Sequence, residues 1–169
     1  MILVKPNIKY IKTFRKYINQ YKIRNDIFYI NLYEEAFGSF SKYIELLNDN
    51  EKGKSLPVGW SSYSTFWLED NNEIVGVIRI RHKNSKHFGH IGYDIAPEYR
   101  NLGYGSKILE LGIIEAKKLG FDTVVLTCLD YNIASQKVIK KNGGFITNIF
   151  ENKDGETLYS FEINLSKTR

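Results

Sequence analysis

Cysteine, proline and methionine are scarce in this chain, which has one cysteine, three prolines and one methionine among its 169 residues. A single cysteine excludes a disulfide bond within the chain. No apolar run approaches the roughly 20 residues of a membrane-spanning helix. The apolar stretch at positions 1–4 is too short for a signal-peptide core, because Lys5 follows at once. We therefore expect a soluble cytoplasmic protein, in a compartment that keeps thiols reduced.

Acidic residues are missing from the first 24 positions, although the whole chain contains 19 of them and has a net charge of +5. The basic residues there are Lys5, Lys9, Lys12, Arg15, Lys16, Lys22 and Arg24. Apolar residues recur between them at helical spacing, so the segment predicts a basic amphipathic helix. Such a helix can bind a membrane or nucleic acid, or it can cover a sheet with its basic face in solvent. We favour the last alternative and expect neither a nucleic-acid nor a membrane partner, because no aromatic or glycine-rich repeat separates the charges.

The sequence pattern changes once, at about position 60. Residues 1–60 are mostly helical in pattern, with apolar spacing that predicts helices near 8–21, 29–36 and 40–47. Residues 61–169 combine two further helices with expected strands at 63–68, 73–82, 88–96, 124–129, 145–151 and 157–165. No repeat, low-complexity linker or domain boundary is visible. We therefore expect a single domain over residues 1–169, long enough to bury a core.

The most informative segment joins a strand that ends before Pro97 to a helix, and it reads Tyr-Arg-Asn-Leu-Gly-Tyr-Gly-Ser over residues 99–106. Its two glycines let backbone amides approach a ligand closely. Free N–H groups and the dipole at the start of the helix favour an anion. The segment therefore predicts a phosphate-binding turn, although it has neither the Lys-Ser/Thr pair of a nucleoside-triphosphate loop nor dinucleotide spacing. The alternative is a tight turn that binds nothing.

A second strand-to-helix junction follows further along the chain. The apolar run 124–129 leads into residues 130–135, Asp-Tyr-Asn-Ile-Ala-Ser, and then into a helix that ends near Gly143. Open α/β sheets bind ligands at the carboxyl ends of their strands. Both junctions are therefore expected to face the same ligand.

Together the two junctions resemble the GCN5-related N-acetyltransferase (GNAT) superfamily. The resemblance runs from about Phe66 to Phe161 and rests on Ile95-x-Pro97-x-x-Arg100-x-x-Gly103-x-Gly105, then Asn132-x-x-Ser135, then Asn142-Gly143-Gly144-Phe145. The surroundings of Trp67, Arg81-His82 and Thr127-Cys128 are similar to an uncharacterised bacterial branch of the superfamily. The resemblance implies an α/β GNAT fold, in which a mixed central sheet splays between two cofactor-proximal strands and has helices on both faces.

The resemblance also implies acetyl-coenzyme A (acetyl-CoA) as cosubstrate and no metal. The 99–106 segment would bind the pyrophosphate, and the backbone near Ile95 would pair with the pantetheine arm and polarise the thioester carbonyl. Asn132 matches the family residue that hydrogen-bonds the pantetheine, and Ser135 lies one helical turn later. The alternative is that Asn132 or Asp130 caps the helix, which could coexist with binding. The implied cofactor-binding residues are Ile95, Arg100, Leu102, Gly103, Tyr104, Gly105, Ser106, Asn132 and Ser135.

The proton transfers of catalysis are less well specified. In many family members a tyrosine seven residues after the asparagine protonates the leaving thiolate, but Ile139 occupies that position here. His90 and Asp94 are candidates for the general base, since they lie four residues apart on one expected strand face. The alternatives are that His90 is a residue at the edge of a strand and that Asp94 only holds a loop in place. Cys128 suggests a covalent acetyl-cysteine route, but direct transfer is the family norm and a cysteine in an apolar strand usually packs.

The sequence does not identify the acceptor. Arg81, His82 and Trp67 are candidate acceptor-binding residues, and the first two would suit an acidic acceptor or simply be solvated. The leading hypothesis is an acetyl-CoA-dependent N-acetyltransferase that transfers acetyl directly to a primary amine of a small molecule or peptide. The alternatives are a non-catalytic acyl-CoA-binding sensor and, with less support, a basic nucleic-acid-binding module. A homodimer is left open.

Overall fold

The computed structural model describes residues 1–85 and 89–167. Lys86, at the end of the expected turn 83–86, and Phe88, at the start of the expected strand 88–96, lie outside the described residues. The strands are β1 (Ile2–Val4), β2 (Tyr63–Asp70), β3 (Glu73–Ser85), β4 (Gly89–Ile95), β5 (Thr123–Leu129), β6 (Phe145–Glu151) and β7 (Thr157–Asn164). The helices are α1 (Ile11–Ile23), α2 (Ile27–Leu32), α3 (Glu34–Gly38), α4 (Phe40–Glu51), α5 (Tyr104–Lys118) and α6 (Ile133–Lys141). Short 3₁₀ turns cover Ile8–Tyr10, Pro97–Tyr99 and Leu165–Lys167.

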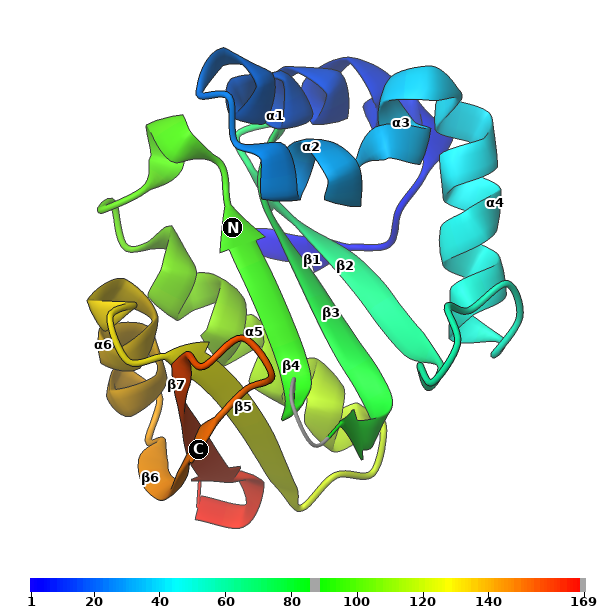
Figure 1. Cartoon of the computed structure of the whole chain (residues 1–169). Helices are drawn as coiled ribbons and strands as arrows, with labels where there is room; N and C mark the ends of the chain where they lie inside the picture. Colours follow the sequence, from blue (N-terminus) through cyan, green and yellow to red (C-terminus); the bar gives the residue numbers. More distant parts are fainter. Residues whose placement is uncertain (86–88, 168–169) are drawn as a thin grey trace.

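Seven strands form one sheet in the order β1-β2-β3-β4-β5-β7-β6 (Figure 1). The strands β1 to β4 form antiparallel ladders with one another, and so do β5, β7 and β6. Between these two halves, the described residues of β4 and β5 share a single pair of Cα partners, Gly89 and Leu126. The expected splay of the sheet is therefore confirmed. The expected mixed character is not seen in the ladders, because the described strands form no parallel ladder and β4 and β5 separate after their one pair.

Gly89 lies at the joint between the two halves of the sheet. Its φ angle is +62°, and a Cβ atom added there would lie 2.4 Å from the carbonyl oxygen of Val125. Glycine adopts this backbone conformation readily and lets β5 approach so closely. The sheet is thus joined at the start of β4 and open toward its carboxyl end, where the sequence predicts a ligand.

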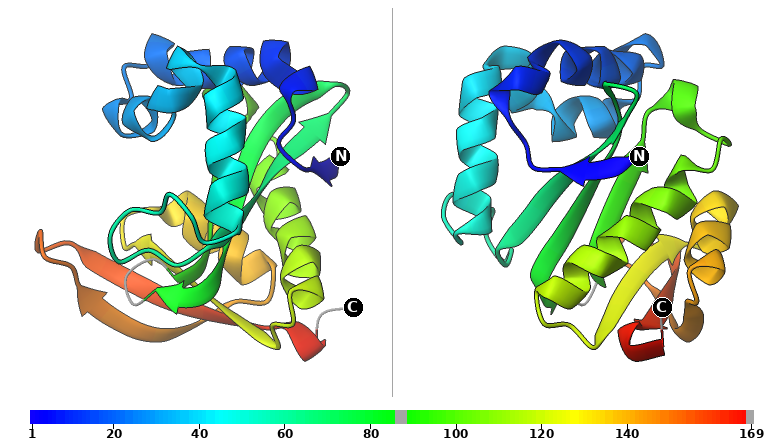
Figure 2. Two further views of the ribbon diagram at one scale, coloured as in Figure 1. Left: turned by 90° about the vertical axis from the view of Figure 1, so that its right-hand side faces the viewer. Right: turned by 180° about the vertical axis from the view of Figure 1, so that it is seen from behind.

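Helices cover both faces of the sheet, as expected (Figure 2). On one face α5 packs against β3 and β4, and α6 packs against α5 and β5, over a core that includes Ile78, Ile108 and Leu126. On the other face α1 covers β3 and α4 covers β2, over a second core that includes Phe14 and Trp67. Successive side chains of a strand point to opposite faces, so β3 and β4 contribute to both cores and position the site between the two layers.

The basic N-terminal segment forms α1 and covers the sheet in the way that the favoured alternative predicts. Phe14 and Ile18 are buried against the sheet, whereas Lys12 and Arg15 are exposed. The pattern at 29–36, expected as one helix, is divided at Tyr33 between α2 and α3. No helix among the described residues combines the length and apolarity needed to span a bilayer.

Candidate active site

The carboxyl-terminal half of β4 has an unpaired edge. Ala96, just after β4, donates its N–H to the carbonyl oxygen of Val75 in β3, at 3.2 Å. Backbone groups of an antiparallel strand alternate between its two neighbours, so the N–H groups of Tyr93 and Ile95 point toward β5 instead. There β5 forms no ladder with them, and Arg100 Nε donates to the Ile95 carbonyl at 3.1 Å. This edge of β4 can therefore receive a peptide-like ligand as an added strand.

The turn after β4 leaves the start of α5 open to an anion. Asn101 and Gly103 adopt positive φ angles of 63° and 87°, which reverse the chain into α5. Gly103 is the N-cap residue, it has no side chain to cap the helix, and no acidic residue lies in the first turn. The first N–H groups of α5 therefore lack partners within the helix, and they form the positive end of its dipole. Such a helix start is a binding site for phosphate.

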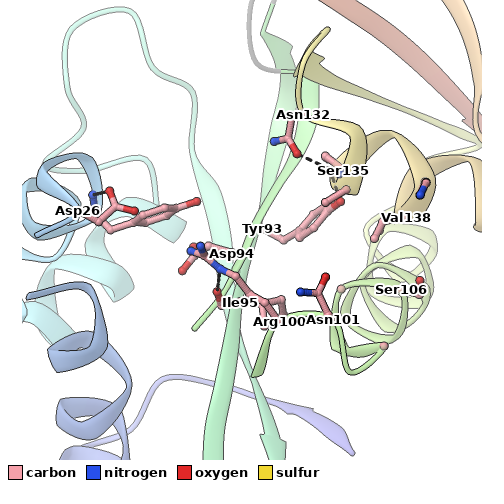
Figure 3. Close-up of a pocket in the computed structure, with 15 residues that line it drawn as sticks. Asp26, Tyr93, Asp94, Ile95, Arg100, Asn101, Ser106, Asn132, Ser135 and Val138 are labelled. Carbon is pink, nitrogen blue, oxygen red and sulfur yellow. Dashed lines mark hydrogen bonds between the residues drawn. The ribbon is translucent and has the colours of Figure 1, made fainter. Parts of the chain in front are cut away.

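The strand edge and the helix start face one pocket of about 550 Å³ (Figure 3). The pocket brings together most of the predicted site residues, namely Asp94, Ile95, Arg100, Gly103, Gly105, Ser106, Asn132 and Ser135. Its other lining residues are Asp26, Tyr29, Tyr93, Asn101, Ala134, Lys137 and Val138. Helical spacing after Asn132 could have indicated the last three. No local signal could have indicated Asp26, because it comes from the N-terminal helical layer.

Leu102 and Tyr104 of the predicted turn do not line this pocket. The Leu102 side chain is exposed to solvent. The Tyr104 hydroxyl donates to Asp70 at 2.6 Å, and its ring packs edge-on against Tyr99. Their predicted contribution to ligand binding is therefore confined to their backbone amides.

The start of α6 forms the opposite wall of the pocket. Asn132 is the N-cap of α6, and its Oδ1 accepts a hydrogen bond from the Ser135 N–H at 3.1 Å. Capping by Asn132 thus occurs, and it leaves the amide nitrogen of the side chain for a ligand. The Ser135 hydroxyl lies 3.1 Å from the Tyr93 hydroxyl. Burial raises the pKa of the neighbouring Cys128 thiol, although a hydrogen bond with Ser135 opposes the shift. A raised pKa disfavours the thiolate that a covalent route through Cys128 would need.

Asp94 lines the pocket but is engaged by the helical layer. Its side chain is nearly fully buried and pairs with Arg79 at 2.9 Å. Its Oδ2 also accepts hydrogen bonds from Tyr21 and Tyr33, both at 2.8 Å, and from Tyr17. Burial and the Asp94 carboxylate together raise the pKa of the Tyr21 hydroxyl, which therefore stays protonated and keeps donating. These contacts attach α1 and α2 to β4, and they occupy the acceptor capacity that a general base would use.

His90 lies at the other end of β4, about 13 Å from Asp94 at the rise of a β-strand. Its Nδ1 accepts a hydrogen bond from the Val125 N–H at 2.9 Å, and its ring packs edge-on against Phe121. Burial and the nearby Arg81 charge lower the pKa of His90. The pocket lining does not include His90, so the two predicted base candidates have separate surroundings.

The His90 contact predicts a pH-dependent component of stability. Because the pKa of His90 is lowered in the folded protein, folding favours the neutral imidazole. The contribution of this neutral form to the free energy of unfolding is complete above the pKa of the unfolded chain, about 6.5, and it is lost as the pH falls. Protonation of Nδ1 also removes the bond from Val125, which contributes about 0.5–1.5 kcal/mol. Between pH 7 and pH 5, the free energy of unfolding of the wild type should fall by about 0.5–1.5 kcal/mol more than that of His90→Gln. Urea denaturation of both proteins at the two pH values measures the difference. Parallel curves for the two proteins would contradict this assignment.

The three candidate acceptor-binding residues are not brought together. Trp67 is fully buried and stacks on Phe14 with ring centroids 4.2 Å apart. His82 lies between two serine hydroxyls. The Arg81 guanidinium lies over the ring of Trp60, 5.7 Å from its centroid. Burial and the Arg79 charge lower the pKa of Arg81 to about 10. Of the three, Arg81 shares a face of β3 with Arg79, the partner of Asp94.

The sequence of this chain matches the family model described as the acetyltransferase (GNAT) family over residues 21–145. The chain belongs to the GNAT family. A curated relative is the uncharacterized N-acetyltransferase YnaD of Bacillus subtilis (strain 168), which is 34% identical over 80 residues, or 45% of each chain. The match thus spans less than half the length of that relative.

Solved structures of GNAT proteins share the fold of this chain. The microcin C7 self-immunity acetyltransferase MccE, solved in complex with acetyl-CoA and AMP, has a TM-score of 0.70 and 19% identity over 96% of this chain and 91% of its own. YncA of Salmonella typhimurium, a putative acetyltransferase solved with acetyl-CoA, has a TM-score of 0.52 and 21% identity, with 62% and 66% covered. At these identities the likeness establishes the fold alone.

One position of the GNAT pattern is plainly different in this chain. Ile139, where many members have a tyrosine, is fully buried in the core between the sheet and α5. It offers no proton and does not line the pocket. A proton donor for the leaving group, if the protein supplies one, must therefore come from elsewhere.

Proposed function

We propose that this protein is an acetyl-CoA-dependent N-acetyltransferase that transfers acetyl directly to a primary amine of a small molecule or peptide. The observation that supports this best is the convergence of two features on one pocket. The uncapped start of α5 provides N–H groups for an anion, and the adjacent edge of β4 is unpaired over several residues. Acetyl-CoA combines a pyrophosphate with a peptide-like arm, so it needs both features side by side.

The residues present fit this cosubstrate along its length. Backbone amides of residues 103–106 would bind the pyrophosphate, and Arg100 would add positive charge. The pantetheine amides would pair with the edge of β4, and the free amide nitrogen of Asn132 would contact them from α6. A neighbouring pocket of about 500 Å³ shares Gly103 and Ser106 with the first and adds Lys107 and Lys141. These two lysines would suit the remaining phosphate of the cosubstrate.

The chemical step requires a polarised carbonyl and a neutral amine. The N–H groups of Tyr93 and Ile95, which have no strand partner, would donate to the thioester oxygen, where charge develops. His90 and Asp94 stay candidates for the base, each with a limit: His90 lies outside the pocket lining, and Asp94 is saturated by Arg79 and the tyrosines. An amine that enters partly deprotonated needs no strong base, so this chemistry does not depend on either residue.

Solved structures that share the fold include a spermidine N-acetyltransferase from Vibrio cholerae and a putative phosphinothricin N-acetyltransferase. Both are named as N-acetyltransferases, which supports an amine as the acceptor of this chain as well.

A second candidate function, an acyl-CoA-binding sensor without catalysis, is favoured by one observation. Ile139 removes the hydroxyl that many relatives use as the general acid. A sensor would bind acetyl-CoA through the same pocket and release no coenzyme A.

Two measurements test the proposed function in sequence. Isothermal titration with acetyl-CoA should show saturable one-to-one binding, and its absence would contradict both candidates. Coenzyme A release, followed with a thiol reagent over amino acids, peptides, polyamines and aminoglycosides, should then exceed the rate without acceptor for at least one class. Binding without release over the whole panel would contradict the enzyme and favour the sensor.

A further inference from the structure

Tyr93 is a lining residue that the sequence motif does not account for. It lies in the unpaired half of β4, two residues before Ile95, and its ring is partly buried against the core under α5. Its hydroxyl lies 3.1 Å from Ser135 Oγ on α6, so this contact joins β4 to the helix that packs on β5. In Figure 3 Tyr93 lies between Asp26 on one side of the pocket and Ser106 on the other. The phenol thus forms part of the pocket lining, on the side of α6.

Acetyl transfer from a thioester produces a thiolate that gains from a proton donor. A phenol, with an ordinary pKa of about 10, is far more acidic than a serine hydroxyl. Among the hydroxyls of the pocket lining, Ser106 lies at the start of α5 and Tyr29 lies on the wall formed by α2. Of the two tyrosines that line the pocket, Tyr29 and Tyr93, only Tyr93 has a hydrogen bond to α6. This helix carries Ser135, and Asn132 caps its start, where the pantetheine arm is expected.

We propose that Tyr93 donates the proton to the leaving thiolate and that Ser135 positions its hydroxyl. The proposal rests on the proposed function. In this step a C–N bond forms between the amine and the acetyl carbon, and the C–S bond breaks with its electron pair going to sulfur. The proton passes from Tyr93 Oη to sulfur. The phenolate then takes up the proton that the amine nitrogen loses, so no further reactant is needed.

The surroundings keep Tyr93 in the form that can donate. Burial raises the pKa of Tyr93 to about 12, with the Ser135 hydrogen bond opposing the shift. The other titratable group beside Ser135 is Cys128 on β5, whose pKa is also raised by burial. Both groups are therefore uncharged near neutral pH, and neither repels a developing thiolate.

The test compares the affinities of coenzyme A and desulfo-coenzyme A, and it needs no acceptor. At pH 9 a thiol of ordinary pKa near 8.5 is mostly ionised, whereas Tyr93 is still protonated. Titration calorimetry on the wild type should show coenzyme A binding about tenfold or more tighter than desulfo-coenzyme A, because hydrogen bonds to charged groups contribute more than neutral ones. In Tyr93→Phe the preference should disappear. In Tyr131→Phe, which removes an exposed hydroxyl that bonds to Glu156 and is not part of the pocket lining, it should be unchanged.

The outcomes distinguish this inference from the proposed function. If the wild type binds neither compound, the proposed function fails and the inference fails with it. If the wild type binds both compounds equally, or if Tyr93→Phe keeps the full preference for coenzyme A, the function stands and Tyr93 is not the donor. A Tyr93→Phe protein that melts like the wild type and binds desulfo-coenzyme A with unchanged affinity, but has lost the preference, supports the proposal.

Discussion

Replacing Ser106 with aspartate is expected to weaken acetyl-CoA binding about 100-fold or more while leaving the fold as stable as before. Ser106 is the third residue of α5 and lines both pockets at the start of that helix. A carboxylate there would face the expected pyrophosphate. Two like charges 4 Å apart near a protein surface repel by about 4 kcal/mol, and each 1.4 kcal/mol corresponds to a tenfold change in affinity. Titration calorimetry with acetyl-CoA measures the loss.

The same substitution should not lower stability, and this separates a binding effect from damage to the fold. A negative charge in the first turn of a helix stabilises it by about 0.3–1 kcal/mol, and α5 has no acidic residue there. The matched control is Ser106→Asn, which is similar in size but uncharged and should lose less than about tenfold in affinity. If Ser106→Asp bound acetyl-CoA as the wild type does, the start of α5 would not be the pyrophosphate site.

Asp94→Asn is expected to lower the free energy of unfolding by about 3–5 kcal/mol. Asp94 is 4% exposed and is the ion-pair partner of Arg79. Removing its charge leaves the Arg79 guanidinium uncompensated in the interior, which is strongly destabilising for a buried pair. The asparagine amide group would also present a donor where Tyr21 and Tyr33 need an acceptor. Urea denaturation, analysed as a two-state transition, measures the change.

Two further variants give the Asp94 prediction its controls. Asp154→Asn makes the same chemical change at an exposed hairpin residue, where it should cost less than about 0.5 kcal/mol. Combining Asp94→Asn with Arg79→Met removes the uncompensated charge and should recover part of the loss, because apolar replacements of buried pairs are often tolerated. A loss below 1 kcal/mol in Asp94→Asn alone would show that the network of Asp94 does not hold α1 and α2 on the sheet.

Local pattern predicts most of the helices and strands of this chain. The apolar alternation at 124–129 corresponds to β5, and the Asp154-Gly155 turn joins β6 to β7. The pattern did not indicate β1, because its three residues are too few for alternation to be visible and only their register with Trp67–Glu69 makes them a strand. It also did not indicate the break at Tyr33, which directs the tyrosine hydroxyl to Asp94.

The candidate site could be predicted in part for the same reason. The turn at 100–106 and the N-cap Asn132 are local features, because a glycine with positive φ and an asparagine at a helix start act through their own backbone. The partners of Asp94 were not predictable, because Tyr17 lies 77 positions away along the chain. Sequence spacing placed Asp94 and His90 on one strand face, but it could not show that each would be engaged by different elements.

The sequence by itself determined the family of this protein, the order of its main strands along the chain and the two junctions where a ligand is expected. These features depend on backbone conformations and on residues close together in the chain. The tertiary structure decided which side chains share the pocket. It placed Tyr93 against Ser135 and left the edge of β4 unpaired. These features depend on contacts between distant segments and on the separation of two strands, because burial and hydrogen-bond geometry arise only when the chain has packed.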